Sequence, residues 1–438
     1  MRTHPSCLEP RECDHLRGHR DGPSTVARTC ADGSQRILRR ARPDSVTRNP
    51  VAAILVAGLG SFGAEARADE PSSENVPSWD VELGYTSDFW RSVTGGLDSG
   101  KRFIGHAELV VDWVGDGALR GRVHLIDNNG RSFSEIVGDT HVVSNIEADR
   151  ASRVLEAWLE YAPDIEDRSL KIGLYDLNSE FDVSEVGGAL INSTFGIGVD
   201  VAQSGLAGPS IFPYTGLAIR GRWRLDDRWL MQGVVIDGVP IDEQAPRRFA
   251  SLKLDSDEGA LWVAELEHQA ERWRAVIGHW RYTSSFEELE SLGSGQSRSS
   301  GGNSGTYGFV EGPVWQAGDR RLLAMLRLGV AEPRFNVIGS TLQAGLVLER
   351  AWLGREGEHV AIGVAHARNG GPARRGAMAS GTERTQSETV VELTWRVPVQ
   401  DRLVLQPDIQ YILNPGSVPG VSSALAIGLR VEFDLSPN

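Results

Sequence analysis

The stretch LVLQPDIQYI, residues 403–412, divides its side chains between two unlike faces when it is read as a β-strand. Alternate side chains of a strand point to opposite sides. Leu405 and Ile409 then share an apolar face, and Gln406 and Asp408 share a polar one. Either the polar face meets bulk water on a soluble sheet, or it lines water inside a membrane barrel. The rest of the chain decides between these arrangements.

The same alternation recurs from residue 79 to the end of the chain. It predicts sixteen strands, at 79–88, 101–114, 118–127, 153–162, 168–176, 215–225, 229–237, 259–269, 272–284, 304–316, 320–330, 340–350, 357–367, 386–397, 401–412 and 422–435. Most span about ten residues, the length that a tilted strand needs to cross a bilayer. Strands of soluble proteins centre on about five or six residues. An even number of such strands is typical of a closed outer-membrane barrel.

The connections between these predicted strands alternate in length. The short ones are 115–117, 163–167, 226–228, 270–271, 317–319, 351–356 and 398–400. The longer ones are 89–100, 128–152, 177–214, 238–258, 285–303, 331–339, 368–385 and 413–421. Outer-membrane barrels have short periplasmic turns and longer outer loops, whereas a soluble sandwich has no reason to sort its loops by end.

The polar faces of the predicted strands carry charges of both signs. Arg220 and Arg222 share one polar face, and Glu388 and Glu392 share another. A dry core would not hold unpaired charges, because each costs several kcal/mol. We therefore predict an all-β protein, a closed antiparallel transmembrane β-barrel of sixteen strands with lipid outside and water inside. The alternative is a soluble double-layer β protein whose charged faces meet bulk water.

The front of the chain is typical of an export signal. VAAILVAGLGSFG, residues 51–63, is an apolar run preceded by Arg48, and Ala66-Arg67-Ala68 gives a small-x-small cleavage pattern. Residues 1–45 show no periodicity and are left out of the fold. The chain is therefore divided into a non-structural N-terminal extension plus signal peptide at 1–68, a linker at 69–78 and an outer-membrane barrel domain at 79–438.

Cysteine use and charge exclude several classes of site and partner. All three cysteines, Cys7, Cys13 and Cys30, lie before residue 68, so the remaining chain has no thiol for a disulfide or a metal site. Beyond residue 68 the chain has 34 basic and 52 acidic residues, a formal charge of −18. Such a charge argues against nucleic acid as a partner.

Signals for enzymatic chemistry are weak. The histidines beyond residue 68 show no HExxH or other paired metal-ligand spacing, and the chain has no G-x-S-x-G and no phosphate-binding loop motif. We therefore expect no catalytic residues, no metal and no cofactor. His279 could partner a serine, so a barrel enzyme of the outer membrane that hydrolyses lipids remains an alternative of another class.

Candidate contacts for a solute lie on the predicted inner faces. In RVLEAWLEYA, residues 153–162, the polar face presents Glu156, Trp158 and Glu160. Sugars have apolar C–H faces that stack on indole and hydroxyls that carboxylates and arginines can bond, and Arg220 and Arg222 add donors. A saccharide contact is one interpretation of the tryptophan. Packing beneath an infolded loop is the other, and the sequence leaves both open.

The longest connection, 177–214, is too apolar to be a free loop. It contains Phe181, Leu190, Ile191 and Phe195, and long loops of this kind are usually functional. We predict that it packs against the inside of the barrel and narrows it. By contrast, 291–305 and 368–385 are interpreted as flexible external loops.

Two stretches resemble carbohydrate-selective porins of the OprB type. They are residues 155–223, with IGLYDLNSEF (172–181) and INSTFG (191–196), and the ending 405–433. The resemblance implies a sixteen-stranded outer-membrane channel that admits sugars by passive diffusion. It also implies that the signature residues belong to the pore and its loop; these residues are Tyr175, Asp176, Asn178 and Glu180.

Together these observations predict a porin of the bacterial outer membrane, assembled as a homotrimer and embedded in outer-membrane lipid. Its permeants would be small sugars, mono- or oligosaccharides, that pass downhill without a cofactor. The alternative within the same fold is a general or organic-anion porin.

Overall fold

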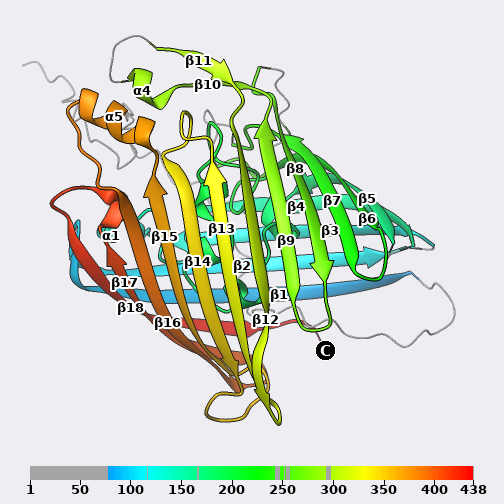
Figure 1. Ribbon diagram of the computed structural model, residues 1–438. Helices are drawn as coiled ribbons and strands as arrows, with labels where there is room; N and C mark the ends of the chain where they lie inside the picture. The colour runs from blue at the N-terminus through cyan, green and yellow to red at the C-terminus, as the bar shows by residue number, and fades with distance from the viewer. Residues whose placement is uncertain are drawn as a thin grey trace, which may run out of the picture. The chain divides into compact units, whose positions relative to one another are not determined.

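The computed structural model describes residues 77–115, 117–164, 167–241, 247–250, 252, 257–292 and 297–437. Sixteen strands form one closed barrel of antiparallel neighbours (Figure 1). Strands that are neighbours in the barrel follow one another along the chain, and β1 pairs with β18 to close the ring. The predicted all-β barrel of sixteen strands is confirmed. The predictions for 1–68 and for most of the linker lie outside the described residues.

All sixteen predicted strands are present, and two of them, β2 and β7, match at both ends. The barrel strands are β1 (Ser78–Gly96), β2 (Lys101–Val114), β3 (Leu119–Gly130), β4 (Ala151–Asp164), β5 (Arg168–Tyr175), β6 (Gly216–Arg224), β7 (Trp229–Asp237), β8 (Ala260–Gln269), β9 (Arg274–Tyr282), β12 (Ser304–Ala317), β13 (Arg320–Ala331), β14 (Ile338–Glu349), β15 (His359–Asn369), β16 (Ser387–Gln400), β17 (Leu403–Leu413) and β18 (Ser422–Asp434).

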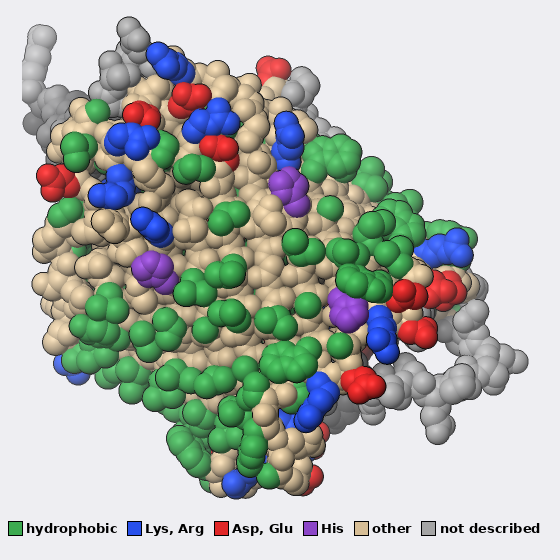
Figure 2. Space-filling view, in the orientation of Figure 1, with side chains coloured by type: hydrophobic (Ala, Val, Ile, Leu, Met, Phe, Trp, Pro, Cys, Tyr) green, Lys and Arg blue, Asp and Glu red, His purple; other side chains and the backbone are tan. Residues whose placement is uncertain are grey.

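The barrel wall is apolar outside and polar inside. On β17, Ile409 and Tyr411 are 48% and 43% exposed, whereas Asp408 and Gln410 are 2% and 0% exposed. Figure 2 shows hydrophobic side chains spread over the outer surface of the strands, with many of the charged side chains towards the two ends. Closure of the barrel leaves no unpaired strand edge, which lipid would not tolerate.

The prediction that short and long connections alternate without exception is wrong. β1 continues to Gly96, past the predicted end at residue 88, because it pairs with β18 as far as Ser422. Only residues 97–100 then connect β1 to β2. This connection, predicted to be long, is shorter than the connection 350–358 between β14 and β15, which was predicted to be short. Strand pairing at the closing seam therefore takes up residues that the alternation had assigned to a loop.

The two stretches interpreted as flexible external loops contain regular structure. The first includes part of α4 (Leu289–Leu292) and β11 (Ser299–Gly301), which pairs with β10 (Ser285–Glu287), and the second includes α5 (Gly371–Ala379). Arg375 and Glu290 join α5 to α4 by two hydrogen bonds of 2.9 Å. No helix among the described residues is long and apolar enough to cross a membrane.

Candidate functional site

The connection between β5 and β6 is built from four short helical turns, and we call residues 177–214 the central segment. The turns are η2 (Leu177–Ser179), α2 (Glu185–Gly188), η3 (Ser193–Phe195) and α3 (Val199–Ala202). The first three follow a residue whose side chain accepts a backbone N–H of the turn; these residues are Asp176, Ser184 and Asn192. Such caps satisfy N–H groups that lack an intrahelical partner.

Carboxylates on the polar face of the wall hold the backbone of the central segment. Glu392 on β16 accepts hydrogen bonds from the N–H groups of Ile191 and Asn192, at 2.5 and 2.9 Å. Glu265 on β8 accepts one from the N–H of Asp182 at 2.7 Å. Both carboxylates are at most 5% exposed, so these bonds replace the water that each has lost.

A buried ion-pair network adds a second attachment. Arg327 on β13 lies between Asp182 and Asp200 of the central segment, with N–O distances of 2.6 and 2.8 Å. Two glycines leave room for it. A Cβ at Gly198 would lie 2.2 Å from the Arg327 guanidinium, and one at Gly329 would lie 2.1 Å from the Asp200 carboxylate. Removing one member of such a buried pair costs about 3–5 kcal/mol.

Apolar side chains of the central segment pack where the wall has glycines. A Cβ at Gly363 on β15 would lie 2.6 Å from both Leu190 and Phe195, and one at Gly345 on β14 would lie 2.8 Å from Val186. These three apolar side chains are at most 2% exposed. All of these contacts are on the face of the strands opposite the exposed apolar one.

A second segment, residues 131–150 between β3 and β4, packs against the same side of the wall, and the sequence analysis missed it. Phe133 and Val143 are 0% exposed and belong to an apolar cluster with side chains of the central segment. Glu388 on β16 accepts the N–H of Thr140 at 2.9 Å. The apolar residues in SFSEIVGDTHVV (132–143), which a free polar loop would not need, are the signal that could have revealed it.

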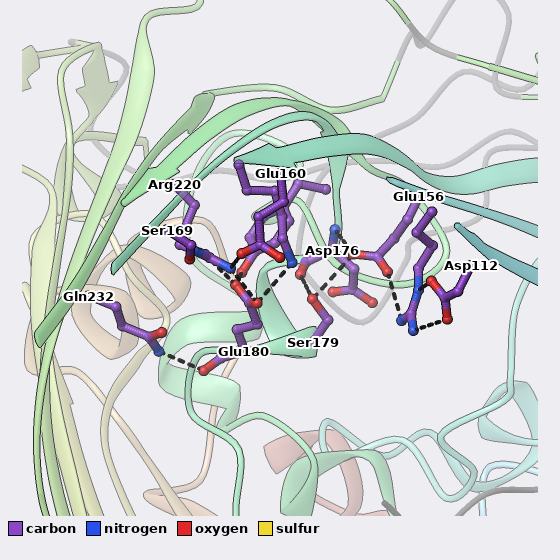
Figure 3. Close-up of polar contacts among 12 residues, drawn as sticks. Asp112, Glu156, Glu160, Ser169, Asp176, Ser179, Glu180, Arg220 and Gln232 are labelled. Carbon is purple, nitrogen blue, oxygen red and sulfur yellow. Dashed lines mark hydrogen bonds and ion pairs between the residues drawn. The ribbon is translucent and has the colours of Figure 1, made fainter. Parts of the chain in front are cut away.

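Three predicted site residues meet a fourth, Glu180, at the start of the central segment (Figure 3). Arg220 on β6 donates two hydrogen bonds to Glu180, at 2.6 and 2.7 Å, and one to Glu160 at 2.8 Å. Tyr175 donates its hydroxyl to Glu180 at 2.6 Å. Lys171, which was not predicted, pairs with Glu180 at 2.8 Å. We call these five residues the Glu180 network.

The carboxylates of the Glu180 network are more exposed than its cations. The side chains of Glu180 and Glu160 are 20% and 13% exposed, and those of Lys171 and Arg220 are 7% and 2% exposed. Two carboxylates and two cations leave the network without net charge when all four are ionised. Its partly exposed carboxylate oxygens can accept hydrogen bonds.

Glu156 belongs to a second polar group beside the network (Figure 3). Its carboxylate accepts the N–H of Asp176 at 3.3 Å and the hydroxyl of Ser179 at 3.2 Å. Arg122 on β3 lies 3.7 Å from it and pairs with Asp112 at 2.7 Å. Glu156 is only 2% exposed, and its hydrogen bonds position the start of the central segment.

The Trp158 ring is bordered by cations. Lys171 Nζ lies 3.8 Å from the ring centroid, and the Arg122 guanidinium lies 5.7 Å from it. The ring also packs against an apolar cluster that includes side chains of the central segment. These contacts favour packing over sugar stacking for this ring. Its indole N–H has no hydrogen-bond partner among the described residues.

Asn178 and Arg222 lie outside both groups. Asn178 donates its amide to the carbonyls of Phe181 and Gly196, at 3.1 and 2.9 Å, and so fixes the backbone of the central segment. Arg222 follows Arg220 by two residues on the same face of β6, and its Nε has no hydrogen-bond partner among the described residues. The structure therefore does not bring the nine predicted site residues together as one set.

Burial and neighbouring charges set the ionisation of two carboxyl groups next to β5. Burial opposes the charged form of Glu180, but Lys171 and Arg220 outweigh it and lower the pKa of Glu180 to about 2. Burial, together with the charge of Glu156, raises the pKa of Asp176 to about 7. At neutral pH Glu180 is therefore ionised, whereas Asp176 is partly protonated.

His279, the candidate partner of a catalytic serine, is on the other side of the wall from the Glu180 network. It is exposed on the outer face of β9, where its Nδ1 lies 2.9 Å from the hydroxyl of Thr306. Within the described ranges, no group of three or more His, Asp or Glu side chains could hold a metal ion. The geometry thus gives no support to the hydrolase alternative at this histidine.

A closed sixteen-stranded barrel with a polar interior and an apolar exterior defines the porin class. The high-pH structure of OprB from Pseudomonas putida has 18% identity and a TM-score of 0.73, over 82% of this chain and 94% of that one. The low-pH structure of the same protein has 14% identity and a TM-score of 0.52, over 82% of this chain and 92% of that one. The outer-membrane channel DcaP of Acinetobacter baumannii has 9% identity and a TM-score of 0.50, over 86% of this chain and 100% of that one. At these identities the likeness shows the fold alone.

The family is shown by the sequence itself. Residues 114–435 match the family model described as carbohydrate-selective porin, OprB family. The chain therefore belongs to this family of bacterial outer-membrane porins, which are channels, and the predicted resemblance is confirmed. No curated protein matches the chain.

Proposed function

We propose that the protein lets sugars diffuse passively through its barrel and selects them at the Glu180 network. The observation that carries this proposal is the balanced charge of the network, with two partly exposed carboxylates supported by two buried cations. Sugar hydroxyls donate hydrogen bonds to such oxygens. The zero net charge favours neutral polar solutes over ions. The family to which the chain belongs supports the same substrate class.

The central segment would narrow the lumen beside the network. It is bonded to the wall at Glu265, Arg327 and Glu392, so its position is fixed and the constriction is permanent. A fixed constriction suits downhill diffusion, because no step of the transport needs a conformational change. Of the predicted pore-lining residues, Glu160 and Glu180 would contact the solute. Arg220 and Tyr175 would orient them.

The location and assembly of the protein follow from the same proposal. Residues 1–68 would direct export and be removed, 69–78 would be a linker, and 79–438 would form the barrel in the outer membrane. Porins of this size commonly assemble as homotrimers, and we propose that arrangement here.

Single-channel recording in a planar bilayer tests the proposed function. We expect an ohmic current that glucose or maltose reduces in a dose-dependent way and that succinate does not block. The variant Glu160→Gln should weaken the block by sugar several-fold. The matched control Glu349→Gln, at a carboxylate paired with Arg321 at the end of β14, should leave it unchanged. A current blocked by succinate and indifferent to sugars would show an organic-anion porin instead.

A further inference from the structure

The outer face of the barrel carries an apolar groove across β9, β12 and β13. Its volume is about 470 Å³, and the outward-facing residues that line it include Ile277, Gly308, Val310, Leu326, Leu328 and Val330. Gly308 is at its centre, because it pairs in register with Ile277 on one side and Leu328 on the other. These two neighbours are 56% and 57% exposed. The missing side chain at Gly308 leaves the gap between them.

Polar groups continue the same columns of residues towards one end of the strands. Next to Gly308 on the outer face of β12 is Thr306, which pairs with His279 of β9. The two side chains are 2.9 Å apart. One step further, Ser304 pairs with Arg281, whose side chain is exposed. The outer face therefore changes from apolar to hydrogen-bonding to cationic along one line.

The distance from the apolar groove to the polar residues fits a lipid whose acyl chain lies in the groove and whose head group lies beside the polar residues. Four residues separate Gly308 from Ser304, about 13 Å along a strand. The polar end adjoins the connection between β9 and β12, one of the longer connections, and in outer-membrane barrels such loops lie on the external side. An aliphatic chain in the groove would thus have its head group beside His279 and Arg281.

We propose that this surface binds one membrane lipid with an anionic, phosphate-bearing head group. The acyl chain would lie in the groove at Gly308. The phosphate would accept hydrogen bonds from the Arg281 guanidinium, which matches phosphate in charge and geometry, and from the pair His279 and Thr306. An exposed histidine on a lipid-facing wall is otherwise unfavourable. The site is separate from the lumen and does not depend on the transported solute.

Native mass spectrometry of the purified barrel in mild detergent tests the site. On titration with phosphatidylglycerol we expect a first lipid adduct that saturates before any further lipid binds. With phosphatidylcholine the occupancy of this first adduct should be at least several-fold lower. The variant Arg281→Glu should abolish the preference between the two lipids. Gly308→Leu should remove the first adduct with either lipid, because it fills the groove.

Two matched variants control for surface changes that are not specific. Gly233→Leu makes the same change on the outer face of β7, where the two residues that pair with it, Gly221 and Ala264, do not line the groove. Arg368→Glu reverses an exposed charge at the same end of β15. Both should behave as wild type. The site is refuted if Arg281→Glu keeps the lipid preference, or if Gly233→Leu loses the adduct as Gly308→Leu does. Displacement of the lipid by an equal concentration of inorganic phosphate would show a free-ion site and would also overturn the proposal.

Discussion

Arg220 is the cation of the Glu180 network that bonds both of its carboxylates. It is 1% exposed and bonds both Glu160 and Glu180. The substitution Arg220→Met should lower the free energy of unfolding by about 3–5 kcal/mol, because it removes one of the two cations that compensate the carboxylates of Glu160 and Glu180. Urea titration of the refolded barrel in detergent measures this loss.

Arg222 provides the matched control on the same face of the same strand. Since its Nε has no hydrogen-bond partner among the described residues, Arg222→Met breaks no ion pair of the Glu180 network and should lower the free energy of unfolding by clearly less than Arg220→Met. Equal losses in the two variants would show that the ion pairs of Arg220 contribute nothing specific.

The pKa of Glu180 predicts an acid-dependent loss of stability. Its pKa falls from the ordinary 4.5 to about 2 in the folded protein. The stability that this carboxylate contributes is therefore present above about pH 4.5, and it is lost as the pH falls towards 2. The slope of unfolding free energy against pH between 2 and 4.5 should be smaller in Glu180→Gln.

A carboxylate at the surface is the control for this pH dependence. The side chain of Glu356 is 76% exposed, so Glu356→Gln should keep the slope of the wild type. If Glu180→Gln titrates like the wild type, the ion pairs with Lys171 and Arg220 do not set the charge of Glu180.

Strand parity predicted which face the site residues on β4 and β6 occupy, but it could not predict their partners. Arg220 and Arg222 are equivalent by alternation, and only Arg220 meets Glu180, which reaches it from the central segment. Trp158 similarly faces inward as predicted, yet Lys171 from the neighbouring strand covers its ring at 3.8 Å. The first outcome depends on how a long connection folds back, and the second on a contact between side chains of neighbouring strands. Alternation encodes neither.

At the scale of elements, the attachment of the central segment to β16 can be tested separately. Glu392→Ala leaves the buried N–H groups of Ile191 and Asn192 without their acceptor, and each unsatisfied group costs about 1–3 kcal/mol. We expect the segment to loosen, single-channel conductance to rise and limited proteolysis to cut within 177–214.

The control for this element is an inward carboxylate with partners on the wall. Glu108 on β2 lies 3.3 Å from His124 of β3, so Glu108→Ala should leave both the conductance and the proteolytic pattern near those of the wild type. An unchanged pattern in Glu392→Ala would mean that this carboxylate does not fix the segment.

Period-two alternation was sufficient to find every strand of the barrel, because one face of each contacts the exterior and the other the interior. It missed the short pair β10 and β11, which is outside the barrel. The same reasoning failed for 131–150. Its buried residues Phe133 and Val143 follow no period, and they are covered by strands far away in the sequence. The wall carboxylates were recognised as inward charges, but their acceptor role depends on contacts such as Glu392 to Ile191, which are 201 residues apart.

Considered as a whole, the barrel satisfies its inward charges by pairing as well as by contact with water. Asp88 and Arg430 join the first and last strands by hydrogen bonds of 2.8 and 2.9 Å, and both side chains are at most 7% exposed. The segments folded against the wall supply many of the other partners. The interior can therefore hold many charged side chains that are paired with one another.

The most direct test of this arrangement is to measure which face of the strands meets lipid. A chain that starts at residue 69 has no cysteine, so single cysteines at Ile409, 48% exposed on the apolar face, and at Glu82, on the polar face of β1, can carry one fluorophore each. In bilayers, brominated lipid should quench the label at 409 and not at 82, while iodide in water should quench the label at 82. Quenching by brominated lipid at 82, with none at 409, would contradict the assignment of the apolar face to lipid and of the polar face to the pore.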